Sequence, residues 1–152
     1  MLARRLRVGF LDFDVEIVRR EGMPIVEIFE RRGEPFFRDR ERALTEEMSR
    51  VPGMVLAPGG GWVTQPDVVA MLRPRSRLVY LRISPMGALR RMGRRMSTRP
   101  LLQKPDPSGE LERLLAMRQS VFEVADVVID VERLDAQRVA QLIERRLGEF
   151  PP

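Results

Sequence analysis

The feature that most constrains the fold is a short apolar run followed by three consecutive glycines. Residues 54–57 read Met-Val-Leu-Ala, and after Pro58 come Gly59, Gly60 and Gly61. An apolar run of this length, bounded by proline and glycine, is typical of a buried strand in a parallel sheet. Glycines directly after it permit backbone turns with positive φ and leave amide groups open to a ligand. The same glycines would equally suit an ordinary turn.

The alternation of apolar strands with helical segments predicts an α/β fold, in a single domain of residues 1–152. Strands are expected at residues 8–11, 54–57, 77–83 and 127–131. Helical segments are expected at 2–7, 15–22, 25–32, 34–50, 66–72, from Pro85, at 109–125 and after Asp135. Because the strands are apolar, we expect a parallel sheet with helices on both faces. Ligands of such sheets bind beyond the carboxyl ends of the strands, where the glycine run would lie.

The composition narrows the chemistry that the chain can perform. There is no cysteine and no histidine, which excludes disulfides, thiolate metal sites and a histidine general base. Acid–base chemistry therefore falls to Asp, Glu, Arg or Lys. The net charge of +5 suits either nucleic acid or the phosphates of a nucleotide. No apolar run is long enough to span a bilayer and no signal peptide is visible, so we expect a cytoplasmic protein.

Two carboxylates follow the first predicted strand. Asp12 and Asp14 lie two positions apart at its carboxyl end, where they suit a cation or a polar ligand. Alternatively, they only cap the helix that follows. Both interpretations stay open at this point.

Charged residues interrupt the apolar stripes of two predicted helices. Glu41 falls on the stripe of the 34–50 helix, with Arg38 three positions before it and within side-chain reach. Arg118 falls on the stripe of the 109–125 helix. A buried charge is costly without a partner, so we expect Glu41 to pair with Arg38 and Arg118 to meet an anion. A solvated ion pair is the alternative for Glu41.

Residues 96–108 are predicted to form a mobile lid. No acidic residue occurs between Asp67 and Asp106, and three prolines interrupt a regular helix in this segment. Arg99 and Lys104 therefore lie in a positively charged, irregular stretch. A solvated basic surface is the alternative interpretation.

Taken in order, these residues resemble the shikimate kinase family, small enzymes with a fold like that of nucleoside-monophosphate kinases. The resemblance covers nearly the whole chain. It is carried by Phe10-Leu11-Asp12-Phe13-Asp14, Ile25 through Phe29, Gly33-Glu34, Phe37-Arg38 with Glu41, Gly59-Gly60-Gly61, Arg99-Pro100-Leu101-Leu102 and Arg118.

The resemblance implies transfer of the γ-phosphoryl group of ATP to the 3-hydroxyl of shikimate, with Mg²⁺, in chorismate and aromatic amino acid biosynthesis. It implies a substrate site formed by Asp14, Arg38, Gly59, Gly60, Gly61 and Arg118. By the same resemblance, Asp14 is also the candidate base and Arg99 the catalytic lid arginine. Nucleotide contacts are implied for Arg91, Arg99 and Arg133, and a second-sphere magnesium contact for Asp12.

The departure from the family is the phosphate-binding loop. The family's GxxGxGK[ST] sequence should precede Leu2, and no GxxxxGK occurs in residues 1–152. Lys104, the only lysine, has neither a glycine loop nor a strand before it. We therefore expect an N-terminally truncated chain that lacks a central first strand and its loop, with impaired kinase activity.

Other functions remain as alternatives. One alternative is a non-catalytic remnant that binds shikimate or another small acid. A second is an arginine-rich nucleic-acid binder, and a third is a different small-molecule kinase, such as a gluconate-type kinase. Stacking aromatics are few, which disfavours nucleic acid, and two arginines that grip a carboxylate favour an acid substrate. We expect shikimate and ATP as partners, no nucleic acid or membrane partner, and a monomer.

Overall fold

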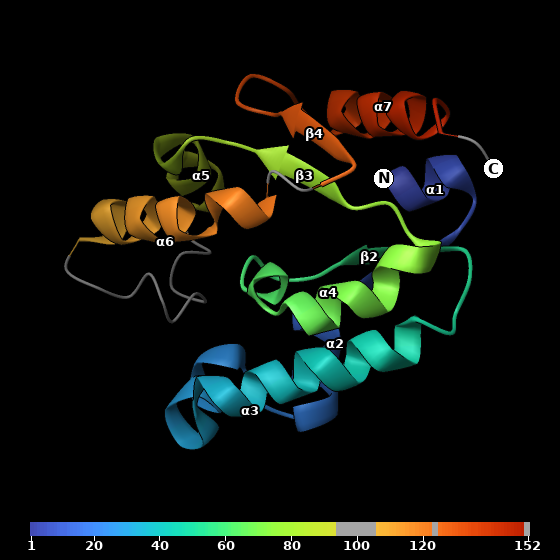
Figure 1. Cartoon of the computed structure of the whole chain (residues 1–152). Coiled ribbons are helices and arrows are strands. Elements are labelled where there is room, and N and C mark those ends of the chain that lie inside the picture. The colour runs from blue at the N-terminus through green and yellow to red at the C-terminus, as the bar shows by residue number, and fades with distance from the viewer. Residues whose placement is uncertain (94–105, 123–124, 151–152) are drawn as a thin grey trace.

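Helices and strands alternate along the chain as the sequence predicts (Figure 1). The structure, a computed structural model, describes residues 1–93, 106–122 and 125–150, without the side chains of residues 107 and 118–121. Its elements are α1 (Leu2–Leu6), β1 (Gly9–Asp12), α2 (Phe13–Glu21), α3 (Ile25–Met48), β2 (Met54–Ala57), η1 (Trp62–Thr64), α4 (Pro66–Leu72), η2 (Arg73–Arg75), β3 (Val79–Arg82), α5 (Pro85–Met92), α6 (Pro107–Phe122), β4 (Val127–Asp130) and α7 (Ala136–Leu147).

The four strands of the described residues form two separate parallel pairs. In the first pair, Gly9 of β1 lies opposite Met54 of β2. In the second, Val79 of β3 lies opposite Val127 of β4. The strands are parallel, as predicted, but they do not join into the one sheet that we expected. Within the described residues, β2 and β3 are not paired with each other.

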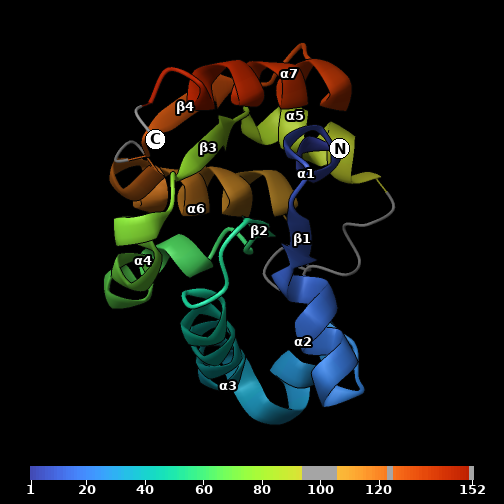
Figure 2. The ribbon, with the colours of Figure 1, turned by 90° about the vertical axis from the view of Figure 1, so that its right-hand side faces the viewer.

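Most helices pack against one of the two strand pairs, whereas α1 contacts β1, β2 and α7. Figure 2 shows α2 and α3 at one end of the molecule and α7 with β4 at the other. The core beside the first pair is buried among α2, α3, η1 and α4, and contains Phe13, Ile17, Ile28, Phe37, Leu44, Trp62, Val63 and Val68. The core beside the second pair contains Val127, Ile129, Val131, Val139 and Ile143.

Glycines end or break the helices near the site where the sequence predicts. Gly22 follows α2 in the left-handed region, with φ of 69°, a conformation that glycine adopts at no steric cost. Gly33, with φ of 79° and ψ of 167°, breaks the helical path inside α3. The predicted boundary between helices 25–32 and 34–50 is thereby confirmed. The bend places the second half of α3 along the first core.

The predicted lid falls mostly outside the described residues. Only its last residues, 106–108, are described, and α6 already begins at Pro107. Proline is well tolerated at a first helical position, since the amide there has no partner within the helix. Among the described helices, none is long and apolar enough to cross a membrane.

Candidate functional site

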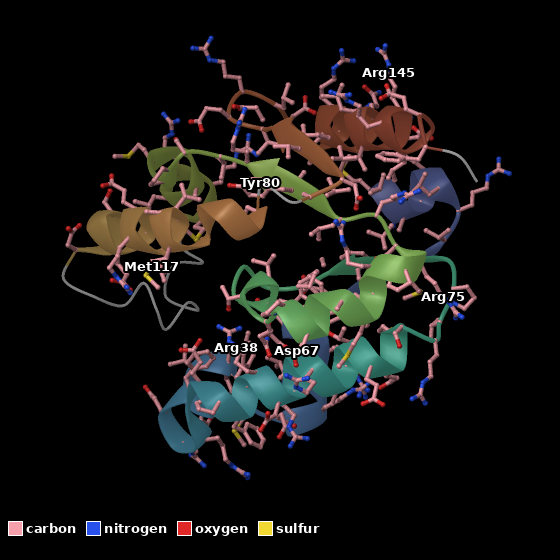
Figure 3. All side chains as sticks on the ribbon, in the orientation of Figure 1. Arg38, Asp67, Arg75, Tyr80, Met117 and Arg145 are labelled. Carbon is pink, nitrogen blue, oxygen red and sulfur yellow. The ribbon has the colours of Figure 1, made fainter. Side chains whose placement is uncertain are left out.

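The candidate site lies where the first strand pair ends. β1 and β2 are parallel and end opposite each other, at Asp12 and Ala57. The residues that follow them, Asp14 and the glycine run (Gly59–Gly61), therefore leave the same edge of the sheet. Figure 3 shows Arg38 rising from α3 toward the part of the chain that holds η1 and α4.

Close neighbours explain the glycines. A Cβ on Gly59 would lie 3.3 Å from Asp14 Oδ1 and 3.5 Å from Glu41 Oε1, and a Cβ on Gly61 would overlap the Arg38 guanidinium. No glycine of the run has positive φ, so the expectation of a left-handed turn here is wrong. A larger side chain at Gly61 would displace the Arg38 guanidinium, and one at Gly59 would contact the Asp14 and Glu41 carboxylates tightly.

Arg38 is held in place by two carboxylates. Its Nη1 donates to Glu41 Oε2 at 2.5 Å, and its Nη2 and Nε donate to Glu34 Oε1 at 2.6 and 3.1 Å. The Arg38 side chain is 17% exposed and that of Glu41 is fully buried. The predicted pairing of Arg38 with Glu41 is confirmed, and the alternative of a solvated ion pair is wrong.

The Glu41 carboxyl has a raised pKa. Burial raises its pKa, the hydrogen bond from Arg38 opposes this effect, and the charge of Asp14 adds to it. Glu41 Oε2 also accepts from Gln65 Nε2 at 3.3 Å. Its other oxygen, Oε1, is buried and has no hydrogen-bond partner within the described part of the chain. That oxygen lies beside Gly59 and so toward the carboxylate of Asp14.

Three residues beneath the site were not predicted from the sequence. Trp62 Nε1 donates to Thr45 Oγ1 at 2.8 Å, and this hydroxyl donates to the Glu41 carbonyl at 2.7 Å. Gln65 reaches the Glu41 carboxylate, as described above. The available signal was position: Trp62 directly follows the glycine run, and Thr45 lies one helical turn after Glu41.

The predicted nucleotide residues lie at the second strand pair. Arg91, near the end of α5, donates through Nη2 to the carbonyls of Val131 and Leu134, the latter at 2.7 Å. Arg133 lies in the same turn, between those two carbonyls. The structure therefore brings Arg91 and the segment of Arg133 together, on elements that are separate from α3 (Figure 1).

Asp12 fits the capping interpretation, and no metal cluster surrounds it. Its Oδ1 accepts from the Val15 amide at 3.2 Å, at the start of α2. The described residues contain no group of three or more His, Cys, Asp or Glu side chains that could hold a metal ion. Arg99 lies outside the described residues, and the side chain of Arg118, on α6, is likewise not described.

Fold and site together define the class of the protein. It is a parallel α/β protein in which carboxylates, an arginine and a glycine run gather at the ends of its first two strands. The shikimate kinase family model matches residues 1–147. The chain belongs to the shikimate kinase family, a family of phosphotransferases.

Individual relatives agree with the family model. The shikimate kinase of Pseudomonas savastanoi pv. phaseolicola is 42% identical over 153 aligned positions, which cover 100% of this chain and 88% of that protein. The shikimate kinase of Thioalkalivibrio sulfidiphilus is 42% identical over 145, covering 95% of this chain and 76% of the relative. The solved structure of shikimate kinase from Acinetobacter baumannii in complex with shikimate has a TM-score of 0.92 at 37% identity, covering 99% of this chain and 85% of that chain. The resemblance seen in the sequence is thereby confirmed, as is the α/β fold.

Proposed function

We propose that this chain binds shikimate at the ends of β1 and β2 and presents its 3-hydroxyl for phosphorylation by ATP. The observation that carries the proposal is the convergence of Asp14, Arg38 and the glycine run at one edge of the first strand pair. Membership of the shikimate kinase family supports the same substrate.

Arg38 suits the carboxylate of the acceptor. A guanidinium forms forked, charge-assisted hydrogen bonds to a planar carboxylate. Glu34 and Glu41 hold Arg38 in one orientation before any ligand arrives, which lowers the entropy lost on binding. Arg118 is proposed as the second arginine at this carboxylate, and the backbone of Gly60 as a contact to the ring.

Asp14 suits the hydroxyl that reacts. As the 3-hydroxyl oxygen forms its bond to the γ-phosphorus, the bond from that phosphorus to the β,γ-bridging oxygen breaks and ADP leaves. The hydroxyl proton passes to the Asp14 carboxylate, which acts as general base. The Arg38 guanidinium, paired with the neighbouring Glu41 carboxyl, offsets part of the negative charge beside Asp14.

The nucleotide side of the reaction is proposed for the second strand pair. Arg91 and Arg133 would contact ATP, and Arg99 would stabilise the charge that develops during transfer. The described residues offer magnesium only Asp12, whose Oδ1 already caps α2. They do not form a metal site by themselves, so no step is assigned to the metal.

We further propose that residues 1–152 alone bind shikimate but transfer phosphate poorly. Phosphate-binding loops of the GxxxxGK[ST] type supply backbone amides, a lysine and a hydroxyl to the nucleotide. No such motif occurs in these residues. The observation favours acceptor binding without efficient turnover in this chain.

A matched pair of arginine variants tests the substrate site. Arg38→Gln removes the charge at the site, whereas Arg40→Gln removes an arginine on the same helix that is 44% exposed and pairs with Glu21. Calorimetric titration with shikimate should show an affinity loss of about ten- to a hundred-fold for Arg38→Gln, as expected for a lost charge-assisted contact. Arg40→Gln should stay close to the unsubstituted chain. Equal losses for both variants, or tighter binding of gluconate than of shikimate, would contradict the proposal.

A further inference from the structure

A hydrogen bond from the indole of Trp62 links the end of the glycine run to α3. Trp62 directly follows Gly61 and is 3% exposed. Its Nε1 donates to Thr45 Oγ1 at 2.8 Å, and the fully buried Thr45 hydroxyl donates to the Glu41 carbonyl at 2.7 Å. An indole N–H can only donate and a carbonyl can only accept, so the hydroxyl has one defined role toward each. This chain of two hydrogen bonds has a single orientation.

These contacts close a ring around the proposed acceptor site. The Glu41 carboxylate holds Arg38 at 2.5 Å, and the Arg38 guanidinium lies against Gly61. Gly61 is covalently joined to Trp62, and Trp62 leads back through Thr45 to Glu41. A movement of the glycine run away from α3 must therefore break a buried hydrogen bond or withdraw the backbone from Arg38.

The other connections between α3 and this part of the chain are weaker. Gln65 reaches Glu41 Oε2 at 3.3 Å, a long hydrogen bond. The ion pair of Arg42 with Asp67 joins α3 to α4, but the two side chains are 42% and 59% exposed. Exposed ion pairs contribute little. Of these three polar links, only the hydrogen bond of the Trp62 indole is both short and buried.

We propose that Trp62 is a positioning residue for the acceptor substrate. Acting through Thr45, it sets the distance between the glycine run and the face of α3 that bears Arg38, without touching the substrate itself. The inference rests on the proposed function, since it assumes that shikimate binds between these elements. It extends that function by assigning a role to a residue outside the set that the sequence predicts.

Isosteric variants separate this role from simple packing. Trp62→Phe keeps an aromatic ring but removes the N–H, and Thr45→Val keeps the shape of the side chain but removes the hydroxyl. Calorimetric titration with shikimate should show each variant binding about five- to ten-fold more weakly. The double variant should bind about as weakly as either single variant, because both remove the same link. Val68→Ala, a fully buried change in the same core on α4, should lower the unfolding temperature and leave shikimate affinity unchanged.

Fluorescence adds a second readout, which reports on the surroundings of the indole itself. Trp62 is the only tryptophan, so the emission spectrum of Thr45→Val reports directly on the environment of the indole and should shift relative to the unsubstituted chain. Unchanged affinity in Trp62→Phe and Thr45→Val would overturn the inference. So would an affinity loss in Val68→Ala equal to theirs at equal loss of stability. Failure of the unsubstituted chain to bind shikimate would instead overturn the proposed function, and this inference with it.

Discussion

Replacing Glu41 should separate its charge from its structural role. The carboxylate is fully buried and accepts hydrogen bonds from Arg38 and Gln65. Glu41→Ala removes both acceptors and leaves Arg38 paired with Glu34 alone. Breaking a buried pair costs about 3–5 kcal/mol, and because Arg38 keeps Glu34 and some exposure we expect about 3 kcal/mol. That is a large share of a domain stability of roughly 5–15 kcal/mol.

Glu41→Gln should behave differently. The amide oxygen still accepts from Arg38 and Gln65, and the cost of burying a charge disappears. Because burial raises the pKa of Glu41 and outweighs the opposing bond from Arg38, we expect Glu41→Gln to change the free energy of unfolding by no more than about 1 kcal/mol at neutral pH.

The pH dependence of stability provides the sharper measurement. The folded chain holds the Glu41 proton more tightly than the unfolded chain does, so this group favours folding at pH below its ordinary pKa of 4.5. That contribution is lost as the pH rises from 4.5 through the raised folded pKa. The carboxyls with a lowered pKa act in the opposite sense and below pH 4.5; they are Glu16, Glu47, Asp67 and Glu132.

The assay is denaturant unfolding of the unsubstituted chain and of Glu41→Gln between pH 5 and 8. The unsubstituted chain should lose stability as the pH rises through this window, and Glu41→Gln should not. An equal slope in both proteins would refute the assignment of the effect to Glu41. A Glu41→Ala variant as stable as Glu41→Gln would refute the structural role of the buried pair.

Two further predictions concern the glycine run and the strand pairs. Gly61→Ala should weaken shikimate binding at least ten-fold in calorimetry, because its Cβ would displace the Arg38 guanidinium. Gly22→Ala, strained at φ of 69° but distant from any side chain, should lower only the unfolding temperature. Residues 1–152 alone should unfold at a lower temperature than a chain extended ahead of Met1 by a strand and phosphate-binding loop, and should show less shikimate-dependent ADP release, because β2 and β3 each lack a partner on one edge. An equal unfolding temperature and comparable turnover in the two chains would contradict this reasoning.

Much of the fold could be predicted because local signals are strong. β2 and α4 have the predicted bounds, since Gly53 and Pro58 bracket β2, and α4 starts at Pro66 and ends shortly before Pro74. Gly22 and Gly33 mark helix ends, because each adopts a positive φ that glycine accommodates without steric strain. The separation of the strands into two pairs is a long-range property. The residues of a strand do not indicate which other strand it pairs with.

The charged residues of the candidate site could be predicted from the sequence, but the residues that hold them in place could not. Glu41 interrupts an apolar stripe, which signals a buried pair, and Arg38 is the nearest cation along the helix. Trp62 and Thr45 look like ordinary core residues in the sequence, because the hydrogen bond between their side chains spans 17 positions. The glycine run was predicted for a conformational reason, whereas the structure requires it for space around Asp14, Glu41 and Arg38.

The arrangement of the two strand pairs bears on how binding and turnover relate. The acceptor-site contacts described above come from residues 12–65, on the elements around the first core. The proposed nucleotide residues Arg91 and Arg133 belong to the second pair, whose core is separate. Phosphoryl transfer requires both parts to be correctly placed relative to each other, whereas the acceptor is held by the first part together with Arg118, which we propose as its second arginine. Loss of connection between β2 and β3 should therefore reduce turnover far more than shikimate affinity, because the ring from Glu41 to Trp62 keeps the first part of the acceptor site assembled.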